Sequence, residues 1–304
     1  MKAELQLGSL VATGPLATVH RGSLGGRAVA VKRGRAGVPG AAAALRREAR
    51  ILRAASHPAL VPVLDVIDDR DQPTLILGWA DGGSLEDLLA DGPLGTDEVL
   101  HLLRPVAGAL GALHRAGVAH LDVSTRNVLL AAAGPVLVDP APPGAGTPGY
   151  ADPAVAAGGL ASPRSDVFGL AACAHVALSG RRPRVGGGVA PGVSLPPAVT
   201  ATLAAGLSRD PAGRPPSTTA FVDQLEAALR SVRGPQAPPT GRVSGRPVAR
   251  DRAPVAGPPR TWPFERWQEE ADAAQARRQR ANPIASTRSE ASMAPPSAGP
   301  ILGA

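Results

Sequence analysis

Residues 118–130, VAHLDVSTRNVLL, set Asp122 and Asn127 between two apolar runs. The chain has only one other asparagine, Asn282. Lysine is equally sparse, since only Lys2 and Lys32 are lysine among the 32 Lys and Arg residues. We interpret the excess of arginine as a coding bias. A lysine or asparagine retained against that bias points to a specific role.

Length and composition limit the class of protein. A chain of 304 residues can form one large domain or two modest ones. One cysteine permits no internal disulfide, which predicts a reducing, cytoplasmic compartment. The N-terminus does not resemble a signal peptide, and no apolar run reaches the ~18 residues of a transmembrane helix.

The composition changes near residue 231. Residues 231–304 are rich in proline and arginine and poor in aliphatic side chains, so we expect this tail to be mostly disordered. Within it, 264–281 has early acidic and late basic residues, which favours a short helix that docks on the domain or on a partner. A transiently helical tail is the alternative. We interpret its positive charge as solvated and predict no specific nucleic-acid binding.

The first 230 residues divide into two predicted lobes. Short β-prone runs and one helical pattern occupy the beginning of the chain, with strands at 17–24, 27–33, 57–68 and 73–80 and a helix at 40–55. Helices follow at 96–117, 164–180, 196–208 and 217–232, the first with Thr96 or Asp97 as its N-cap. This order predicts an α+β fold with a small β-rich lobe and hinge (1–80) and a larger helical lobe (81–230).

A series of motifs gives these lobes a family resemblance. VAVK ends at Lys32, Glu48 follows in the helix, HLDVSTRN spans 120–127, and Asp139 follows VLV. Further on come GTPGYADPA (146–154), SDVFGL (165–170) and DPAGRPP, which contains Arg214. In this order and spacing, residues ~5–230 resemble a eukaryotic-type protein kinase domain of the Ser/Thr class found in bacteria.

The resemblance implies a role for each matching residue. Lys32 would bind the phosphates of ATP, and Glu48 would pair with the Lys32 ammonium. Asp122 would orient the attacking hydroxyl. Asn127 and Asp139 would bind Mg²⁺, and Asp166 would hold the catalytic-loop backbone. The nucleotide would also contact Ala12, Gly14, Val19, Ala30, the gatekeeper Leu77, Gly78, Ala80 and Leu129. Solvated surface residues are the alternative for Lys32, Glu48 and Asp122, and a strand-end turn is the alternative for Asp139.

The sequence also departs from the family pattern. Ala12 and Ala17 replace two glycines of the phosphate loop, which predicts weaker nucleotide binding. Leu121 replaces the arginine that meets a phosphorylated activation segment. Because that segment is short, we expect no regulation through it. Ser124 replaces a lysine whose charge Arg126 would supply.

Two more departures affect packing. Pro140 and Ala141 replace the phenylalanine and glycine after the metal-binding aspartate, so the position of the Glu48 helix must be set in another way. Ala154 replaces the glutamate that pairs with Arg214. A compensating contact for this arginine must exist, because a broken buried pair costs roughly 3–5 kcal/mol.

The sequence therefore predicts a Ser/Thr protein kinase that uses ATP and Mg²⁺ and acts on a protein substrate or signalling partner. A pseudokinase that binds nucleotide or a partner without phosphoryl transfer is the main alternative. A small-molecule phosphotransferase is a third interpretation, although such enzymes seldom contain segments like GTPGY and SDVFGL.

Overall fold

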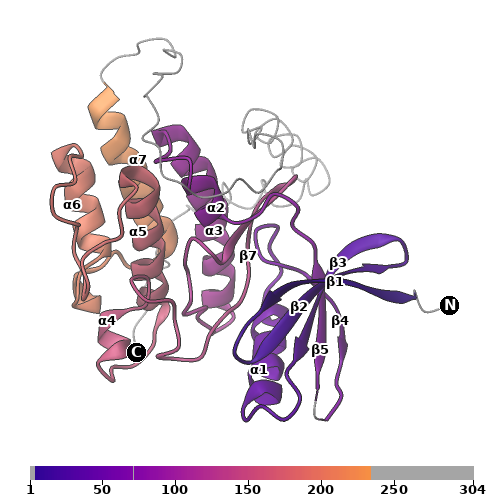
Figure 1. Ribbon diagram of the computed structural model, residues 1–304. Coiled ribbons are helices and arrows are strands. Elements are labelled where there is room, and N and C mark those ends of the chain that lie inside the picture. The colour runs from indigo at the N-terminus through magenta and orange to yellow at the C-terminus, as the bar shows by residue number, and fades with distance from the viewer. Residues whose placement is uncertain (1–3, 71, 234–304) are drawn as a thin grey trace, which may run out of the picture. The chain divides into compact units, whose positions relative to one another are not determined.

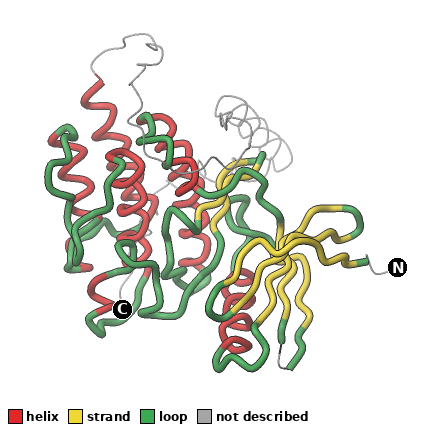
Figure 2. The backbone as a smooth tube through the Cα atoms, in the orientation of Figure 1, coloured by secondary structure: helices red, strands yellow, loops and turns green. Residues whose placement is uncertain are grey.

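The computed structural model describes residues 4–70 and 72–233 (Figures 1 and 2). The predicted tail beyond Arg233, with its proposed helix at 264–281, lies outside the described residues. The last described helix runs three residues past the predicted domain boundary at 230, because its pattern continues to Arg233.

An antiparallel five-stranded sheet forms the N-terminal lobe. Its order is β1-β2-β3-β5-β4, with β1 Leu5–Thr13, β2 Ala17–Leu24, β3 Arg27–Gly34, β4 Val63–Ile67 and β5 Thr74–Gly78. Val29 and Val31 alternate on one face of β3 and form a buried cluster with Ile76. Gly25 and Gly26 both adopt positive φ, as a two-residue hairpin turn requires. Helix α1 (Ala41–Ala54) packs against β3, β4 and β5.

The strand predicted at 57–68 begins later, at Val63. The residues before it include Pro58 and Pro62, which have no N–H for a strand ladder. Leu60 instead forms an isolated bridge with Leu137, which joins this segment to the helical lobe. The sequence suggested strand character from the apolar residues alone and therefore placed the start too early.

The helical lobe is built around α5 (Pro163–Ser179), which is buried over most of its surface. Helices α3 (Thr96–Arg115), α6 (Pro197–Gly206) and α7 (Thr218–Arg233) contact it. Shorter elements complete the lobe: α2 Leu85–Leu89, the hairpin β6 Val128–Ala131 with β7 Gly134–Leu137, α4 Pro153–Ala156 and the 3-10 turn Pro211–Gly213. A membrane-crossing helix would have to be longer and more apolar than any helix in the described residues.

The N-cap of α3 is Gly95, not Thr96 or Asp97. Thr96 is already the first helical residue, and the Glu98 carboxylate accepts a hydrogen bond from the Gly95 amide at 2.7 Å. This carboxylate satisfies an N–H group at the helix start, as a threonine or aspartate cap would have done.

Candidate active site

Lys32, at the end of β3, meets two carboxylates in the structure. Its Nζ lies 2.9 Å from Glu48 Oε1, 2.7 Å from Glu48 Oε2 and 2.9 Å from Asp139 Oδ1. Burial alone would lower the pKa of Lys32, but the charges of Asp139 and Glu48 outweigh it and raise that pKa. The side chain therefore keeps its positive charge although it is only 12% exposed. The predicted Lys32–Glu48 ion pair is present, whereas the contact with Asp139, 107 residues away, had no signal in the sequence.

The loop at 120–127 is held by Asp166 from the first turn of α5. One oxygen of Asp166 accepts from the His120 amide at 2.9 Å and the other accepts from the Leu121 amide at 2.7 Å. His114 Nε2 also lies 2.7 Å from this carboxylate. Leu121 has φ of 68°, a left-handed conformation that costs free energy for a branched side chain. The predicted contact of Asp166 with the loop backbone is thus present and stabilises a strained residue.

The Asp122 carboxylate is fixed on both sides. Its Oδ1 accepts from the Thr147 amide at 2.7 Å and from the Thr147 hydroxyl at 2.6 Å. Its Oδ2 accepts from Asn127 Nδ2 at 2.7 Å, and the same nitrogen donates to the Asp122 carbonyl. Because the Asn127 nitrogen is turned to Asp122, the amide oxygen is the atom available as a metal ligand. The sequence analysis missed this contact between Thr147 and Asp122.

His120 is completely buried behind this loop. Its Nε2 lies 3.0 Å from the Val138 carbonyl, and its Nδ1 accepts from the Asp122 amide at 3.3 Å. One ring nitrogen must donate and the other accept, which is the pattern of a neutral imidazole. Burial lowers the pKa of His120 against the opposing charges of Asp166, Asp122 and Asp139, which favours the same neutral form.

Asp139 follows β7, which ends two residues earlier at Leu137. The Val138 amide bonds to the Asn127 carbonyl, and Asp139 turns away with φ of 60°. The side chain is 44% exposed, so one face remains accessible while Oδ1 binds Lys32. Pro140 stands at the family's phenylalanine position, and the Lys32–Glu48 pair ties α1 to the site.

A cavity of about 420 Å³ lies above these residues, between the two lobes. It is lined by the following predicted residues: Ala12, Val19, Ala30, Lys32, Leu77, Gly78, Ala80, Arg126, Leu129 and Asp139. Val11, Val61, Trp79 and Val138 also line it and were missed by the sequence analysis. Mostly apolar walls with a few charged groups at one end are typical of a nucleotide or small-molecule site.

Gly14 does not line this cavity, in contrast to its neighbours on β1 and β2. Its amide donates to the Ala17 carbonyl at 2.8 Å, closing a tight turn. Arg35 Nη1 donates to the Gly14 and Pro15 carbonyls at 3.3 and 3.4 Å and holds the outside of the turn. The amide of this remaining glycine is therefore engaged within the loop.

Ser124, which replaces the family lysine, and Arg126, which was expected to supply its charge, have different surroundings. Ser124 is completely buried, and its hydroxyl accepts from Thr147 at 3.5 Å, so it cannot reach a ligand in the cavity. Arg126 lies at the surface, where its guanidinium pairs with Glu86 of α2. Hydrogen bonding to Glu86, followed by the Glu86 charge, raises the pKa of Arg126.

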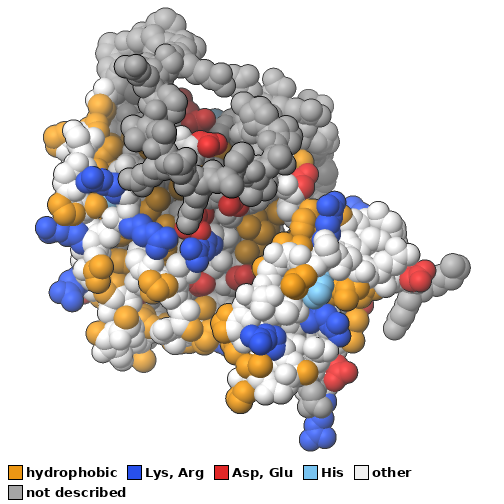
Figure 3. All heavy atoms as spheres, in the orientation of Figure 1, with side chains coloured by type: hydrophobic (Ala, Val, Ile, Leu, Met, Phe, Trp, Pro, Cys, Tyr) orange, Lys and Arg blue, Asp and Glu red, His pale blue; other side chains and the backbone are white. Residues whose placement is uncertain are grey.

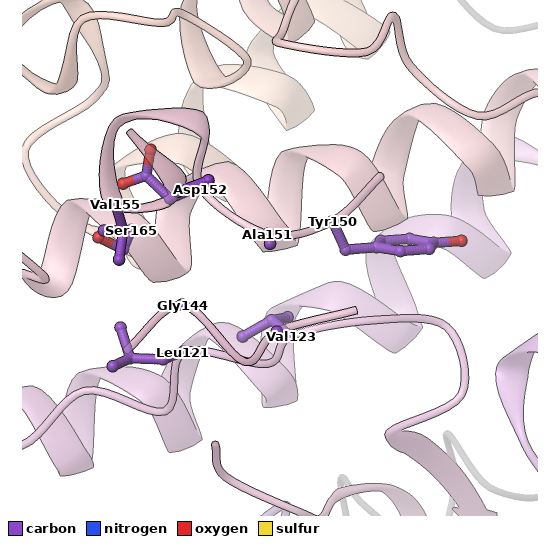
Figure 4. A pocket seen from close by; sticks show the side chains of 11 residues that line it. Leu121, Val123, Gly144, Tyr150, Ala151, Asp152, Val155 and Ser165 are labelled. Atoms are coloured by element: carbon purple, nitrogen blue, oxygen red, sulfur yellow. The ribbon is translucent and has the colours of Figure 1, made fainter. Parts of the chain in front are cut away.

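Arg214 has an ion-pair partner, which is the compensating contact expected from the loss of the glutamate at Ala154. Its Nη1 and Nη2 donate to Asp152 Oδ2 and Oδ1 at 2.7 and 2.6 Å. The carboxylate thus comes from a position two residues earlier than the family pattern places it. Figure 4 shows Asp152 and Ser165 beside a cavity of about 30 Å³, which has room for about one water molecule.

Comparisons with known proteins agree with this geometry. Residues 5–139 match the family model described as protein tyrosine and serine/threonine kinase. The serine/threonine-protein kinase PknL of Mycobacterium tuberculosis is 31% identical over 222 residues, which cover 63% of this chain and 56% of PknL. PknA of the same organism is 31% identical over 236 residues, covering 66% of this chain and 54% of PknA. The chain thus spans about half the length of these two relatives.

A solved structure covers more of the fold. The crystal structure of the Mycobacterium tuberculosis PknI kinase domain is similar with a TM-score of 0.60 and 25% sequence identity, over 75% of this chain and 97% of that one. Its match extends over both lobes, whereas the family model ends at Asp139. By its motifs, its fold and these similarities, the described part of the chain is similar to bacterial eukaryotic-type protein kinase domains.

Proposed function

We propose that this chain is an ATP-dependent protein kinase that transfers the γ-phosphoryl group to a serine or threonine hydroxyl of a protein. The observation that carries the proposal is the Lys32–Glu48–Asp139 cluster, in which Lys32 and Asp139 line the cavity between the lobes. Asp122 and Asn127 do not line this cavity, but they bind each other in the loop that contributes Arg126 to its wall. Relatives of similar sequence are named serine/threonine-protein kinases, which supports the same class of reaction.

The chemistry of the donor set fits Mg–ATP. Asn127 Oδ1 and the accessible side of Asp139 are hard oxygen donors, the kind that Mg²⁺ prefers. The described residues contain no cluster of three or more His, Cys, Asp or Glu side chains suited to a metal, so phosphate oxygens and water would complete the coordination. When bound, Mg²⁺ would neutralise charge on the β- and γ-phosphates.

The chain's own residues would then do the following. Lys32 holds the phosphates by charge, and the walls formed by Val19, Ala30 and Leu129 enclose the base. The Gly78 amide already donates to the Pro62 carbonyl, which leaves the Gly78 carbonyl to accept from the base. The acceptor hydroxyl attacks the γ-phosphorus in line, its oxygen–phosphorus bond forms as the bond to the β-phosphate oxygen breaks, and Asp122 takes the proton.

We further propose that phosphorylation of the activation segment does not control this enzyme. Both candidate hydroxyls of the segment are engaged: Thr147 donates to Asp122, and the buried Tyr150 hydroxyl lies 2.8 Å from Thr125 Oγ1. Leu121 offers no charge to a phosphate. The active arrangement would therefore persist without modification.

One observation favours a pseudokinase instead. The Gly14 amide is used inside its turn, and the neighbouring family glycines are Ala12 and Ala17, so the loop has fewer ways to approach the phosphates. In that case the cavity would hold nucleotide weakly, and the chain would act by binding a partner. The single, buried Cys173 is compatible with the reducing, cytoplasmic setting that we propose for either function.

The test of transfer uses labelled ATP, Mg²⁺ and a mixture of acidic and basic protein substrates. We expect wild type to label substrate, and Asp122→Asn and Lys32→Ala to reduce the rate by at least about a hundredfold. Asp91→Asn, an exposed aspartate outside the site, is the matched control and should retain the wild-type rate. Equal labelling by wild type and Asp122→Asn would reject the enzyme.

Nucleotide binding is measured separately by thermal shift with Mg–ATP. A shift without transfer would support the pseudokinase. If millimolar nucleotide gives no shift and transfer is also absent, the cavity does not serve a nucleotide.

A further inference from the structure

Two exposed arginines next to the catalytic loop share a single carboxylate. Arg126 donates through Nε to Glu86 Oε2, and Arg182 Nη2 donates to Glu86 Oε1 at 3.1 Å. The side chains of Arg126, Arg182 and Glu86 are 64%, 49% and 36% exposed. The group therefore has two positive charges for one negative charge and faces solvent.

Both arginines lie close to the residue that would activate the acceptor hydroxyl. Arg126 is four residues after Asp122 in the same loop. Arg182 Nη1 donates to the Pro148 carbonyl at 3.4 Å, and Pro148 directly follows Thr147, whose amide binds Asp122. The guanidinium of Arg182 also lies over the Tyr150 ring, 5.5 Å from its centroid. A polypeptide that brings a hydroxyl to Asp122 must pass beside these two groups.

The local charge balance stays positive when Asp87 of α2 and the arginines beside Arg182 are included. The other carboxylate of α2, on Asp87, accepts from the Ser84 amide and hydroxyl at 2.8 Å and serves as a helix cap. Arg181 and Arg184 flank Arg182 in the chain and are exposed. Figure 3 shows several Lys and Arg side chains on one face of the helical lobe, with Asp and Glu side chains beside them.

The arginines can take a further carboxylate without leaving Glu86. The two guanidinium groups carry about ten N–H donors, and the contacts with Glu86 and Pro148 use three of them. Exposed ion pairs such as these contribute little to stability, so the side chains can also rearrange at little cost. Stacking on Tyr150 orients Arg182, and an oriented guanidinium binds a carboxylate through two parallel hydrogen bonds.

We propose that Arg126 and Arg182 select acidic protein segments, in which aspartate or glutamate residues flank the serine or threonine to be phosphorylated. The proposal rests on the protein kinase function argued above and adds the class of substrate. An arginine next to the acceptor would meet two guanidinium groups instead of a carboxylate, and basic segments would be disfavoured by repulsion.

Three short peptides test this selection, each with one serine flanked by glutamate, by alanine or by arginine. With Mg–ATP, we expect kcat/KM to be about tenfold higher for the glutamate peptide than for the alanine peptide, the effect of one charge-assisted hydrogen bond. Arg182→Glu should remove this advantage while the alanine peptide reacts at about the wild-type rate. Arg27→Glu, an exposed arginine of β3, makes the same change in net charge and should retain the preference.

A binding measurement separates this inference from the proposed function. Fluorescence anisotropy of the same peptides with wild type and Arg182→Glu, in the presence of Mg–ADP, requires no catalysis. Acidic preference in binding without transfer would reject the enzyme and keep the inference. Transfer or binding without any preference for the glutamate peptide, or a preference that survives in Arg182→Glu, would overturn the inference, as would no binding to any peptide.

Discussion

The buried pair of Arg214 and Asp152 is the compensating contact that the sequence called for without locating it, and removing its carboxylate tests its contribution to stability. The two side chains are 0% and 3% exposed. In Asp152→Asn, the amide keeps the volume and one acceptor oxygen but loses the negative charge. In Asp152→Ala, the whole acceptor is lost.

The structure sets the expected magnitude. Removing one partner of a buried ion pair costs about 3–5 kcal/mol. Arg214 keeps hydrogen bonds to the Ser208 and Arg164 carbonyls at 2.9 Å, and its guanidinium lies 5.1 Å from the centroid of the Phe168 ring. These contacts remain in the variant, so we expect a loss near the lower end, about 3 kcal/mol, for Asp152→Asn.

Asp152→Ala should cost more because Asp152 has a second task. Its Oδ1 accepts from the Ala154 amide at 2.9 Å as the N-cap of α4. Loss of an N-cap costs about 1 kcal/mol, which brings the expected total for Asp152→Ala to about 4 kcal/mol. At roughly 2–4 °C per kcal/mol, the melting temperature should fall by about 10 °C.

The same pair predicts how stability depends on pH. Burial would raise the pKa of Asp152, but hydrogen bonds from Arg214, Ser165 and the Ala154 amide outweigh it and lower that pKa. The folded pKa is then below the unfolded value of about 3.9. The contribution to the free energy of unfolding is present above pH ~3.9 and is lost as the pH falls through the folded pKa.

Urea denaturation at neutral pH measures these differences. Asp210→Asn is the matched control, because Asp210 also caps a turn, through the Ala212 amide at 2.9 Å, but is exposed and faces no buried cation. The double variant Asp152→Ala with Arg214→Met removes both charges and should be more stable than Asp152→Ala alone. A cost below about 1 kcal/mol for Asp152→Asn, or no recovery in the double variant, would refute the role assigned to this pair.

Three further predictions concern packing, an unpaired cation and pH. Gly206→Ala should lower the free energy of unfolding by about 1–3 kcal/mol, because a Cβ there would lie 2.6 Å from the Ala171 Cβ. As a control, Gly111→Ala within α3 should raise it by about 0.5–1 kcal/mol. Equal effects of the two substitutions in urea denaturation would contradict the close packing at Gly206. Arg47→Met should raise the free energy of unfolding by about 1 kcal/mol, since Nη1 of Arg47 is buried without a hydrogen-bond partner among the described residues. As a control, Arg50→Met at an exposed position should change it by less than about 0.5 kcal/mol. Burial lowers the pKa of His120, so its contribution to the free energy of unfolding is present above pH ~6.5 and is lost as the pH falls below that value. In urea denaturation at several pH values, His120→Phe should lose less stability on acidification than wild type. An unchanged dependence of stability on pH would exclude His120 as the group responsible.

Features encoded by neighbouring residues could be predicted from the sequence. The β-prone run and the helical pattern predicted β3 and α1 to within one residue of their observed bounds. Once α1 packs against β3, Lys32 and Glu48 lie side by side, because their separation of sixteen residues places both at the same end of the α1–β3 contact. The order of motifs identified the kinase-like fold and most of the residues that line the nucleotide cavity.

Contacts between distant segments required the tertiary structure. Arg214 is paired with Asp152 because the geometry of α4 and the turn before α7 brings that carboxylate to the guanidinium, although the family pattern indicated position 154. The Lys32–Asp139 contact and the sharing of Glu86 by Arg126 and Arg182 join residues from different lobes or loops. A sequence determines which side chains are charged and which faces are apolar. Packing of the complete chain decides which opposite charges come within hydrogen-bonding distance, since a shift of two residues along the backbone leaves the local pattern unchanged.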